Sequence, residues 1–378
     1  MKCKTLSCCI VVKNGEKQII SCLDNISVLA DEIVGVDTGS TDKTCAAVNW
    51  WASKHNAKGN VKLVPVGDKF HDSDGDFNFG EAKSFAFTQA TRDYVMWLDV
   101  NDEVLEQVEL KKSFVRHAHE GEVYISVPTV TSPRHSFKRV RIGPRKKSKM
   151  VGRIHEYMVI ENPSDDIRRV DLSTPIKNFK ESRKLDRNLR QLLKEWDREE
   201  SSRTAFYIAD TYRGMADSEN AIKWYRIRVS RFDWIEEYHD EHCKSLECIA
   251  DLTLKSLNAG KYDPADIYDI ATELIRLEPN RMEGYYYMAR YYMHLSEWET
   301  ALTYLRKYNE CSIPKNAGMW LNEHIYHGRA IINSIEKCKT ALKYSGVLKP
   351  DAILDSRPSS TFRGGDDQYE VNKDQTIF

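Results

Sequence analysis

The stretch that decides the expected fold reads YVMWLDVNDE and occupies residues 94–103. Its first five residues are apolar, and three oxygen-bearing side chains follow them: Asp99, Asn101 and Asp102. A continuous apolar run of this length is typical of a strand that is buried on both faces of a parallel sheet. Ligands of open α/β sheets bind beyond the carboxyl ends of the strands, so these side chains would lie at a binding site and would suit Mg²⁺ or Mn²⁺. The spacing alone fits an acidic, solvated turn equally well.

Composition limits the classes of protein that come into question. The 378 residues are enough for two domains, and a formal net charge of -1 argues against a protein that binds nucleic acid electrostatically. Nine cysteines are scattered without CxxC pairs, which indicates a reducing compartment rather than a zinc site or a disulfide framework. The apolar run near the N-terminus ends at Lys13 without a cleavage site, and no stretch approaches the roughly 20 apolar residues that span a bilayer. We therefore expect a soluble, cytoplasmic protein without a transmembrane segment.

Two strand-turn-helix units precede this stretch. Residues 5–12 are expected to form a first strand, and apolar residues at helical spacing predict a helix over 19–30. Residues 33–36 are expected to form a second strand that ends in Asp37, and a helix should begin near Lys43. The Asp37 carboxylate could accept hydrogen bonds from a ribose or a base, or it could only satisfy its own turn.

Three later features complete the first half of the chain. A third strand is expected over 61–66. A helix that begins within 76–87 and runs to residue 90 carries Lys83, which could meet a phosphate or remain solvated. After a strand over 123–130, we interpret the basic segment 136–142, which includes Arg141, as a solvated loop or a phosphate-binding segment. The next polar pair is His155-Glu156, a kind of pair that is more often structural than catalytic.

Four motifs occur together and in a characteristic order: CCIVVKNGE (8–16), ADEIVGVDTGSTDKT (30–44), DFNFGEAKSFAF (76–87) and YVMWLDVNDE (94–103). In combination they resemble glycosyltransferase family 2, in the branch that carries a helical-repeat domain. The resemblance covers roughly the first 160 residues. It implies a GT-A fold, which is a Rossmann-like α/β domain that binds a nucleoside diphosphate sugar with a divalent metal, and an inverting single displacement.

The resemblance also implies roles for individual residues. Asp99 and Asn101 fill the outer positions of the family's DxD motif, although the family usually has a carboxylate where Asn101 stands, and Gly15 and Lys83 replace the more common Glu and Arg. The implied metal ligands are Asp99, Asn101, Asp102 and His155. The implied donor contacts are Val11, Asn14, Asp37, Lys83, Asp99 and Arg141. Because inverting transfer needs a base beside the donor, Glu156 is the expected base and Asp102 the second candidate.

The second half of the chain reads as helical repeats. A charged connecting helix is predicted over 179–200, and it separates a GT-A domain over 1–178 from a helical domain over 201–345. Two segments 80 residues apart share small residues at a spacing of 12 and aromatic residues beside them: Ala209 and Ala221, Ala289 and Ala301, Tyr212 and Tyr292, Trp224 and Tyr304. This pattern resembles tetratricopeptide repeats, with a middle unit near Ile249 and a final helix over 320–342. The tail over 346–378 is expected to be disordered.

The sequence therefore predicts a metal-dependent, inverting glycosyltransferase with UDP as the favoured nucleotide and Mn²⁺ or Mg²⁺ as cofactor. Its acceptor would be a hydroxyl of a glycan or a protein, and its helical domain could form a homodimer. The alternative is a repeat scaffold whose sugar-nucleotide domain is weakened or inactive, which the departures at Asn101 and Gly15 favour. A nucleotidyltransferase would need a Gly-rich basic loop after the first strand, and residues 13–16 do not provide one.

Overall fold

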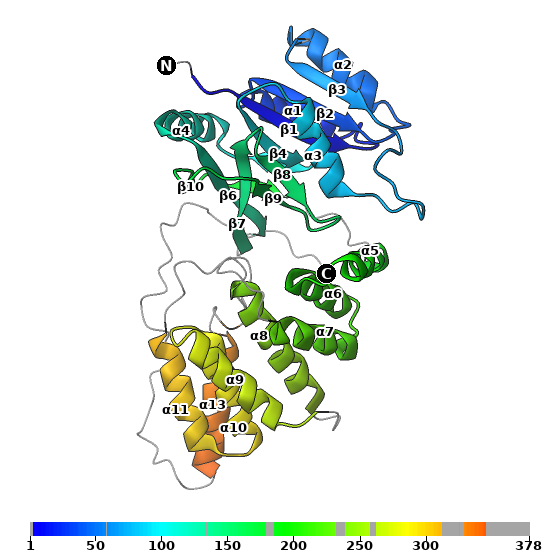
Figure 1. Ribbon diagram of the computed structural model, residues 1–378. Helices are drawn as coiled ribbons and strands as arrows, with labels where there is room; N and C mark the ends of the chain where they lie inside the picture. The colour runs from blue at the N-terminus through cyan, green and yellow to red at the C-terminus, as the bar shows by residue number, and fades with distance from the viewer. Residues whose placement is uncertain are drawn as a thin grey trace, which may run out of the picture. The chain divides into compact units, whose positions relative to one another are not determined.

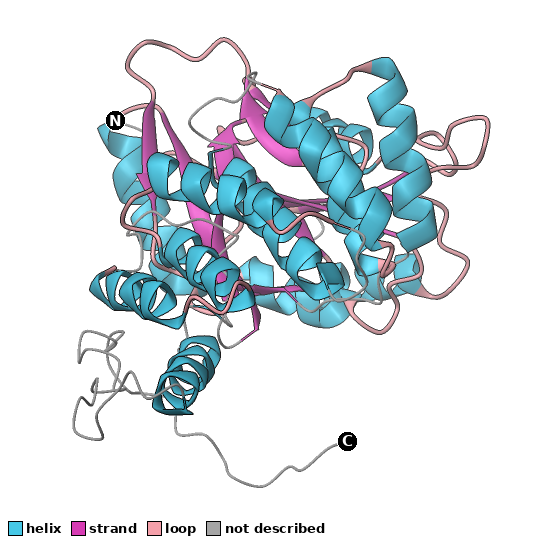
Figure 2. Ribbon diagram, turned by 90° about the horizontal axis from the view of Figure 1, so that it is seen from below, coloured by secondary structure: helices cyan, strands magenta, loops and turns pink. Residues whose placement is uncertain are grey.

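The computed structural model describes residues 3–57, 59–132, 135–178, 185–231, 239–257, 262–311, 325 and 329–344. The chain forms two compact units, Met1–Tyr238 and His239–Phe378 (Figure 1). All the described strands belong to the first unit. Figure 2 draws the strands in magenta and the helices in cyan. The predicted tail over 346–378 lies outside the described residues, and the boundaries predicted at 178 and 201 stay predictions.

A nine-stranded mixed sheet is the frame of the first unit. Its order is β3-β2-β1-β4-β7-β6-β11-β5, with β10 paired to β6. Pairing is parallel from β3 to β4, which is the Rossmann-like part, and antiparallel where β7 meets β4 and β6. The strands are β1 (Leu6–Val12), β2 (Glu32–Asp37), β3 (Val61–Pro65), β4 (Tyr94–Asp99), β5 (Asp102–Val104), β6 (Val123–Ser132), β7 (His135–Pro144), β10 (Arg168–Asp171) and β11 (Ile176–Asn178).

Alternate residues of the central strands are buried on opposite faces of the sheet. On β4, Met96 and Leu98 join one apolar cluster with the helices α1 (Ile19–Ser27) and α4 (Gln107–Glu120), while Trp97 joins the other cluster. The helix α3 (Phe79–Gln89) and the hairpin of β8 (Ser148–Val151) and β9 (Tyr157–Ile160) supply that second cluster. The remaining helix between strands is α2 (Thr44–Lys54). Burial on both faces explains why β4 reads as a continuous apolar run.

The interpretation of residues 136–142 as a loop is wrong. They lie in β7, which pairs antiparallel with β4 at Met96 and with β6 over most of its length. Ile142 of this strand is fully buried, and the guanidinium of Arg141 lies 3.8 Å from the centre of the Trp97 ring. Stacking on Trp97 therefore accommodates Arg141 inside the fold, whereas Lys138 of the same strand is exposed and pairs with Asp171.

Three helices complete the described part of the first unit: α5 (Leu185–Arg198), α6 (Ser202–Gly214) and α7 (Ser218–Ser230). The second unit contains α8 (His239–Ser256), α9 (Ala265–Leu277), α10 (Met282–His294), α11 (Trp298–Glu310) and α13 (Arg329–Tyr344). Within each unit, consecutive described helices from α5 onward pack against one another, as in helical-repeat proteins. The fold class is therefore a GT-A Rossmann-like domain followed by an all-α, TPR-like helical-repeat domain.

The internal repeat is present at the predicted register. Ala209, Ala221, Ala289 and Ala301 are all fully buried, so the paired helices approach closely at these positions. The turns between α6 and α7 and between α10 and α11 each contain a residue with φ of 62°, and these two residues, Ala216 and Ser296, are also 80 positions apart. Part of the predicted final helix over 320–342 lies outside the described residues.

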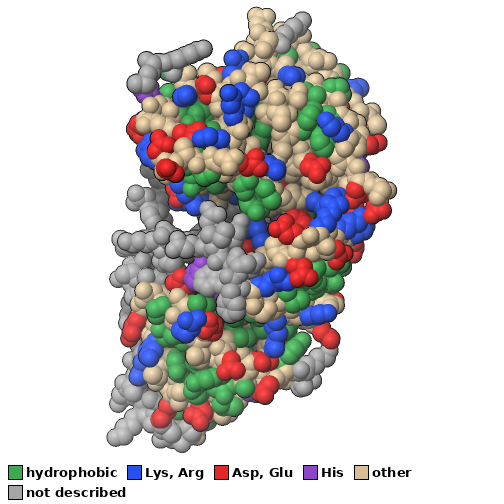
Figure 3. Space-filling model, in the orientation of Figure 1, with side chains coloured by type: hydrophobic (Ala, Val, Ile, Leu, Met, Phe, Trp, Pro, Cys, Tyr) green, Lys and Arg blue, Asp and Glu red, His purple; other side chains and the backbone are tan. Residues whose placement is uncertain are grey.

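Two further properties concern the hydropathy of the helices and the charges on the surface. Among the described helices, none is both long enough and apolar enough to cross a membrane. On the face that Figure 3 shows, Lys and Arg side chains are interspersed with Asp and Glu side chains within each unit.

Candidate active site

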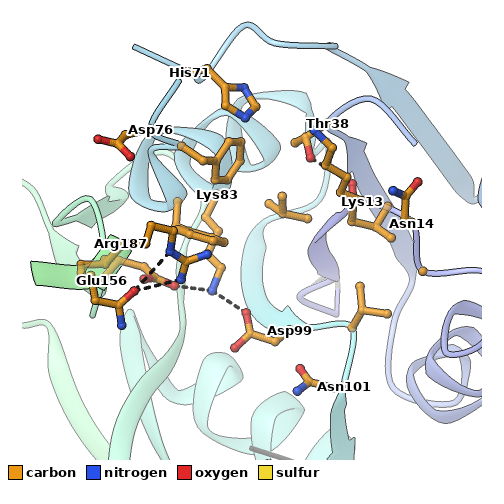
Figure 4. Close-up of a pocket in the computed structure, with 18 of the residues that line it drawn as sticks. Lys13, Asn14, Thr38, His71, Asp76, Lys83, Asp99, Asn101, Glu156 and Arg187 are labelled. Atoms are coloured by element: carbon orange, nitrogen blue, oxygen red, sulfur yellow. Dashed lines mark hydrogen bonds and ion pairs between the residues drawn. The ribbon is translucent and has the colours of Figure 1, made fainter. Parts of the chain in front are cut away.

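A pocket of about 790 Å³ lies at the carboxyl ends of β1 and β4 in the first unit. Such a volume is typical of small-molecule sites. Its walls come from the turn after β1, the segment before α3, the end of β4, the loop between β8 and β9, and α5 (Figure 4). In the parallel part of the sheet the chain returns from β3 to β4 beside β1, so the pocket lies where the strand order reverses, the usual ligand site of such sheets.

The turns after β1 and β2 are joined by hydrogen bonds at the mouth of the pocket. Asn14, which has a φ of 52°, accepts a hydrogen bond from the Thr41 backbone at 2.8 Å, and its own N–H donates to the Ser40 hydroxyl at 2.9 Å. The Gly15 N–H donates to the Thr44 hydroxyl at 2.8 Å. Val11 and Asn14, which were predicted to contact the nucleotide-sugar donor, both line the pocket.

Lys83 lies between two carboxylates at the centre of the site. Its Nζ donates to Asp99 at 2.7 Å and to Glu156 at 2.5 Å (Figure 4). The Lys83 side chain is 3% exposed, whereas those of Asp99 and Glu156 are 37% and 14% exposed. The ammonium also lies 4.3 Å from the centre of the Trp97 ring, which favours a cation.

Charge pairing decides the protonation of this cluster. Burial by itself would lower the pKa of Lys83, but the charges of Asp99 and Glu156 outweigh burial and raise the pKa above its ordinary value. Burial by itself would raise the pKa of Asp99, but Lys83 and then Arg141 lower it. At neutral pH the site therefore holds an ammonium and an ionised Asp99.

Local backbone geometry brings Glu156 to Lys83. Asn78 caps α3 by accepting a hydrogen bond from the Glu81 N–H at 3.0 Å, so Lys83 lies early in the helix. A Cβ on Gly80 would lie 2.2 Å from the Gly152 carbonyl oxygen, so only glycine allows α3 this close to the loop between β8 and β9. His155 in that loop has a φ of 52°, and its ring stacks on Tyr207 of α6 at 4.2 Å.

Seven of the predicted site residues line this pocket: Val11, Asn14, Lys83, Asp99, Asn101, His155 and Glu156. Asp102 and Arg141 do not line the pocket. Asp102 was expected to bind the metal or to act as the second candidate base, and Arg141 was expected to contact the sugar donor. Their side chains are fully buried and form an ion pair at 2.9 Å, and the second Asp102 oxygen accepts from Asn178 at 2.5 Å. Sheet formation by the unforeseen strand β7 places Arg141 beneath β4, where it holds Asp102 away from the pocket.

Asp37 also lies outside the lining of the pocket. Its carboxylate accepts hydrogen bonds from the Ser40 backbone at 3.1 Å and from the Ser40 hydroxyl at 2.6 Å. These contacts match the alternative in which Asp37 satisfies its own turn. The adjacent residue, Thr38, lines the pocket instead.

The residues present fit a metal only in part. Among the described residues, no group of three or more His, Cys, Asp or Glu side chains is arranged to hold a metal ion. Asp99 and Asn101 do line the pocket (Figure 4), and Mg²⁺ is commonly bound through one or two protein oxygens together with substrate phosphates. This pair therefore suits a metal that is completed by a diphosphate rather than an all-protein site.

Helix α5 is a wall of the pocket that the sequence did not reveal. Arg187, Asn188 and Arg190 line the pocket from this helix, together with His71 and Phe77 from the segment before α3 and Phe79 at its start. The helix is attached by ion pairs of Asp76 with Arg190 at 2.5 Å and with Lys194 at 2.8 Å. A charged amphipathic helix gives no signal of such a partner, because its spacing specifies which face is apolar but not what that face meets.

We expect Asp76→Asn to destabilise the first unit at neutral pH and progressively less as the pH falls below about 4. The hydrogen bond with Arg190, aided by Lys194, outweighs partial burial and holds the pKa of Asp76 well below its ordinary value. A depressed pKa stabilises the fold above the unfolded-state pKa of about 4, and this contribution is lost as the pH falls through the folded-state pKa. Because Arg190 is 55% exposed, we expect only about 1–2 kcal/mol at pH 7.

Urea unfolding at pH 7 and at pH 2 measures this difference. Asp68→Asn is the matched control, since the Asp68 side chain is 88% exposed, and it should change the free energy of unfolding by less than about 0.5 kcal/mol. A difference between wild type and Asp76→Asn that is the same at both pH values would contradict the prediction.

Comparison with known proteins agrees with this geometry. Residues 7–164 match the family model described as glycosyl transferase family 2, which covers the mixed sheet as far as the end of the β8–β9 hairpin. This part of the chain therefore belongs to glycosyltransferase family 2, and the helical repeats follow it. No curated protein matches the chain in sequence.

Similar solved structures fall into two groups. S. aureus TarS is 13% identical over 81% of this chain and 91% of that chain, with a TM-score of 0.32. Glucosyl-3-phosphoglycerate synthase from Mycobacterium tuberculosis is 17% identical over 48% and 74%, with a TM-score of 0.33. The TPR-containing C-terminal domain of a Plasmodium falciparum protein is 15% identical over 42% and 95%, with a TM-score of 0.29. Likeness at these scores carries no argument about substrate or partner.

Proposed function

We propose that the protein transfers a sugar from a nucleoside diphosphate sugar to an acceptor hydroxyl, with inversion at the anomeric carbon. The observation that carries this proposal is the cluster of Lys83, Asp99 and Glu156 in a pocket at the carboxyl ends of β1 and β4, within a family 2 domain. The nucleoside would lie near Val11, Asn14 and Thr38, and the diphosphate would lie near Asp99.

Glu156 is the base in this proposal. It takes the proton of the acceptor hydroxyl, whose oxygen forms a bond to the anomeric carbon while the bond to the diphosphate breaks. In the absence of donor, Lys83 donates a hydrogen bond to the Glu156 carboxylate at 2.5 Å. A bound diphosphate competes for the same ammonium, so donor binding would release the Glu156 carboxylate to accept the proton of the acceptor hydroxyl.

The same proposal extends to the metal site, the identity of the nucleotide and the oligomeric state. Asp99 and Asn101 would hold Mn²⁺ or Mg²⁺ together with diphosphate oxygens, and the metal would neutralise the leaving group. Lys83 would share that neutralisation, which offsets the missing carboxylate at position 101. UDP as the favoured nucleotide, a cytoplasmic location, a glycan or protein acceptor, and a homodimer through the helical repeats rest on the sequence alone.

The experiment is a thermal-shift and donor-hydrolysis screen of UDP- and GDP-sugars with Mn²⁺, Mg²⁺ or EDTA. We expect a metal-dependent shift and slow release of nucleoside diphosphate in the wild type, and we expect Asp99→Ala to lose both because it removes the carboxylate of the metal and the partner of Lys83. Asp171→Ala, which removes an exposed carboxylate of β10, is the control. No shift with any donor in folded protein would overturn the transferase and leave the repeat scaffold, whose sugar-nucleotide domain is inactive.

A further inference from the structure

Arg187 is a cation of the pocket that pairs with no carboxylate among the described residues. It lies in the first turn of α5, and its side chain lines the pocket. Its hydrogen-bond partner among the described residues is the Asn188 side-chain oxygen, which accepts from Nε at 3.3 Å and from Nη2 at 2.9 Å. A guanidinium has five N–H groups, so about three of them remain for a ligand.

The other cations around this wall are paired. Arg190 and Lys194 bind Asp76, and Arg153 binds Asp72 at 2.8 Å. These carboxylates neutralise the basic residues that attach α5 and do not reach Arg187. The charge of Arg187 is therefore available to whatever enters the pocket.

Packing restricts where the Arg187 guanidinium can go. It lies 5.7 Å from the centre of the Phe79 ring, and Phe79 is itself held edge-on against Phe77 at 4.7 Å. Contact with an aromatic face and with the Asn188 amide leaves the outer edge of the planar group available. That edge matches the two oxygens of a carboxylate or a phosphate.

The position of Arg187 separates it from the nucleotide side of the pocket. In the view of Figure 4, Arg187 and Glu156 lie on one side of the pocket, whereas Lys13, Asn14 and Thr38 lie on the other side. In the proposed function the base stands where the acceptor hydroxyl enters. A group that Arg187 binds is therefore on the same molecule as that hydroxyl.

We propose that the acceptor is anionic and that Arg187 binds its phosphate or carboxylate group close to the hydroxyl that Glu156 deprotonates. This inference rests on the proposed function, since it takes Glu156 to mark the acceptor side. It makes Arg187 a residue that determines acceptor specificity, contributed by a helix outside the stretch that matches the family model.

Calorimetric titration of UDP-loaded protein tests this assignment. The probes are glucose, glucose 6-phosphate and glucuronate, which share a ring and differ in charge. We expect at least one anion to bind the wild type about tenfold more tightly than glucose, and we expect Arg187→Gln to abolish that preference. The two anions distinguish phosphate from carboxylate. Arg169→Gln, on the exposed surface of β10, is the matched control and should keep the preference.

The outcomes separate the two proposals. If UDP does not bind the wild type, the proposed function fails. If UDP binds but no anion is preferred, or if Arg187→Gln keeps the preference, only the anionic acceptor is overturned. If Arg187→Gln instead weakens UDP binding more than about tenfold, Arg187 binds the diphosphate of the donor, and its assignment to the acceptor is wrong. An unchanged UDP affinity with lost anion preference supports it.

Discussion

Replacing Glu156 by Gln should lower the rate of donor turnover by about 10²–10⁴-fold, because an amide cannot take the proton of the attacking hydroxyl. The affinity for UDP should change little, since Glu156 lies on the side of the pocket away from Asn14 and Thr38 (Figure 4). Loss of kcat with retained binding is the signature of an interaction made in the transition state. Turnover is measured as nucleoside diphosphate release, with water or an added acceptor as the nucleophile.

The control for this prediction is Glu161→Gln. Glu161 follows the same hairpin but forms an exposed ion pair with Lys149 at 3.3 Å, so its loss should leave turnover unchanged. Wild-type turnover in Glu156→Gln would remove this residue as the base. Asp99 would then be the remaining candidate among the predicted carboxylates that line the pocket.

Replacing Arg141 by Met should destabilise the first unit by about 3–5 kcal/mol, because it leaves the buried Asp102 carboxylate without its cation. Both side chains are fully buried, and Arg141 also donates to the Thr129 hydroxyl at 3.2 Å. Removing one partner of such a pair costs more than removing both. The double variant Arg141→Met with Asp102→Asn should therefore lose less than the sum of the two single variants.

Urea unfolding of the four proteins in this cycle measures the coupling. Arg169→Met is the control, because Arg169 pairs with Asp171 on the surface and should contribute less than about 1 kcal/mol. If Arg141→Met lowers the free energy of unfolding no more than Arg169→Met does, the ion pair of Arg141 with Asp102 does not stabilise the sheet at β4. Additive single variants would show that the two charges do not act on each other.

Local sequence was sufficient for the parallel part of the sheet and for the helical pairs. Runs such as 94–98 are buried on both faces, so their apolar character is visible without any tertiary information. The repeat was visible because Ala209 and Ala289 perform the same packing task 80 residues apart. The antiparallel strand β7 was not visible, because a segment rich in Arg and Lys reads as solvated until Trp97 and Asp102 are known to lie beside Arg141.

The sequence by itself determined the strands and helices of an α/β domain, the helical repeats and the polar residues at the carboxyl ends of β1 and β4, since each of these follows from spacing along the chain. Its resemblance to glycosyltransferase family 2 added the nucleotide-sugar fold. The tertiary structure alone decided which of those residues face the pocket. Asp102 and Arg141 pair inside the sheet, whereas Lys83 and Glu156, which are 73 residues apart, meet through the contact of α3 with the hairpin loop. Arg187 entered the site in the same way, from α5. Contacts between distant segments depend on how whole elements pack, and periodicity within one segment carries no information about its partner.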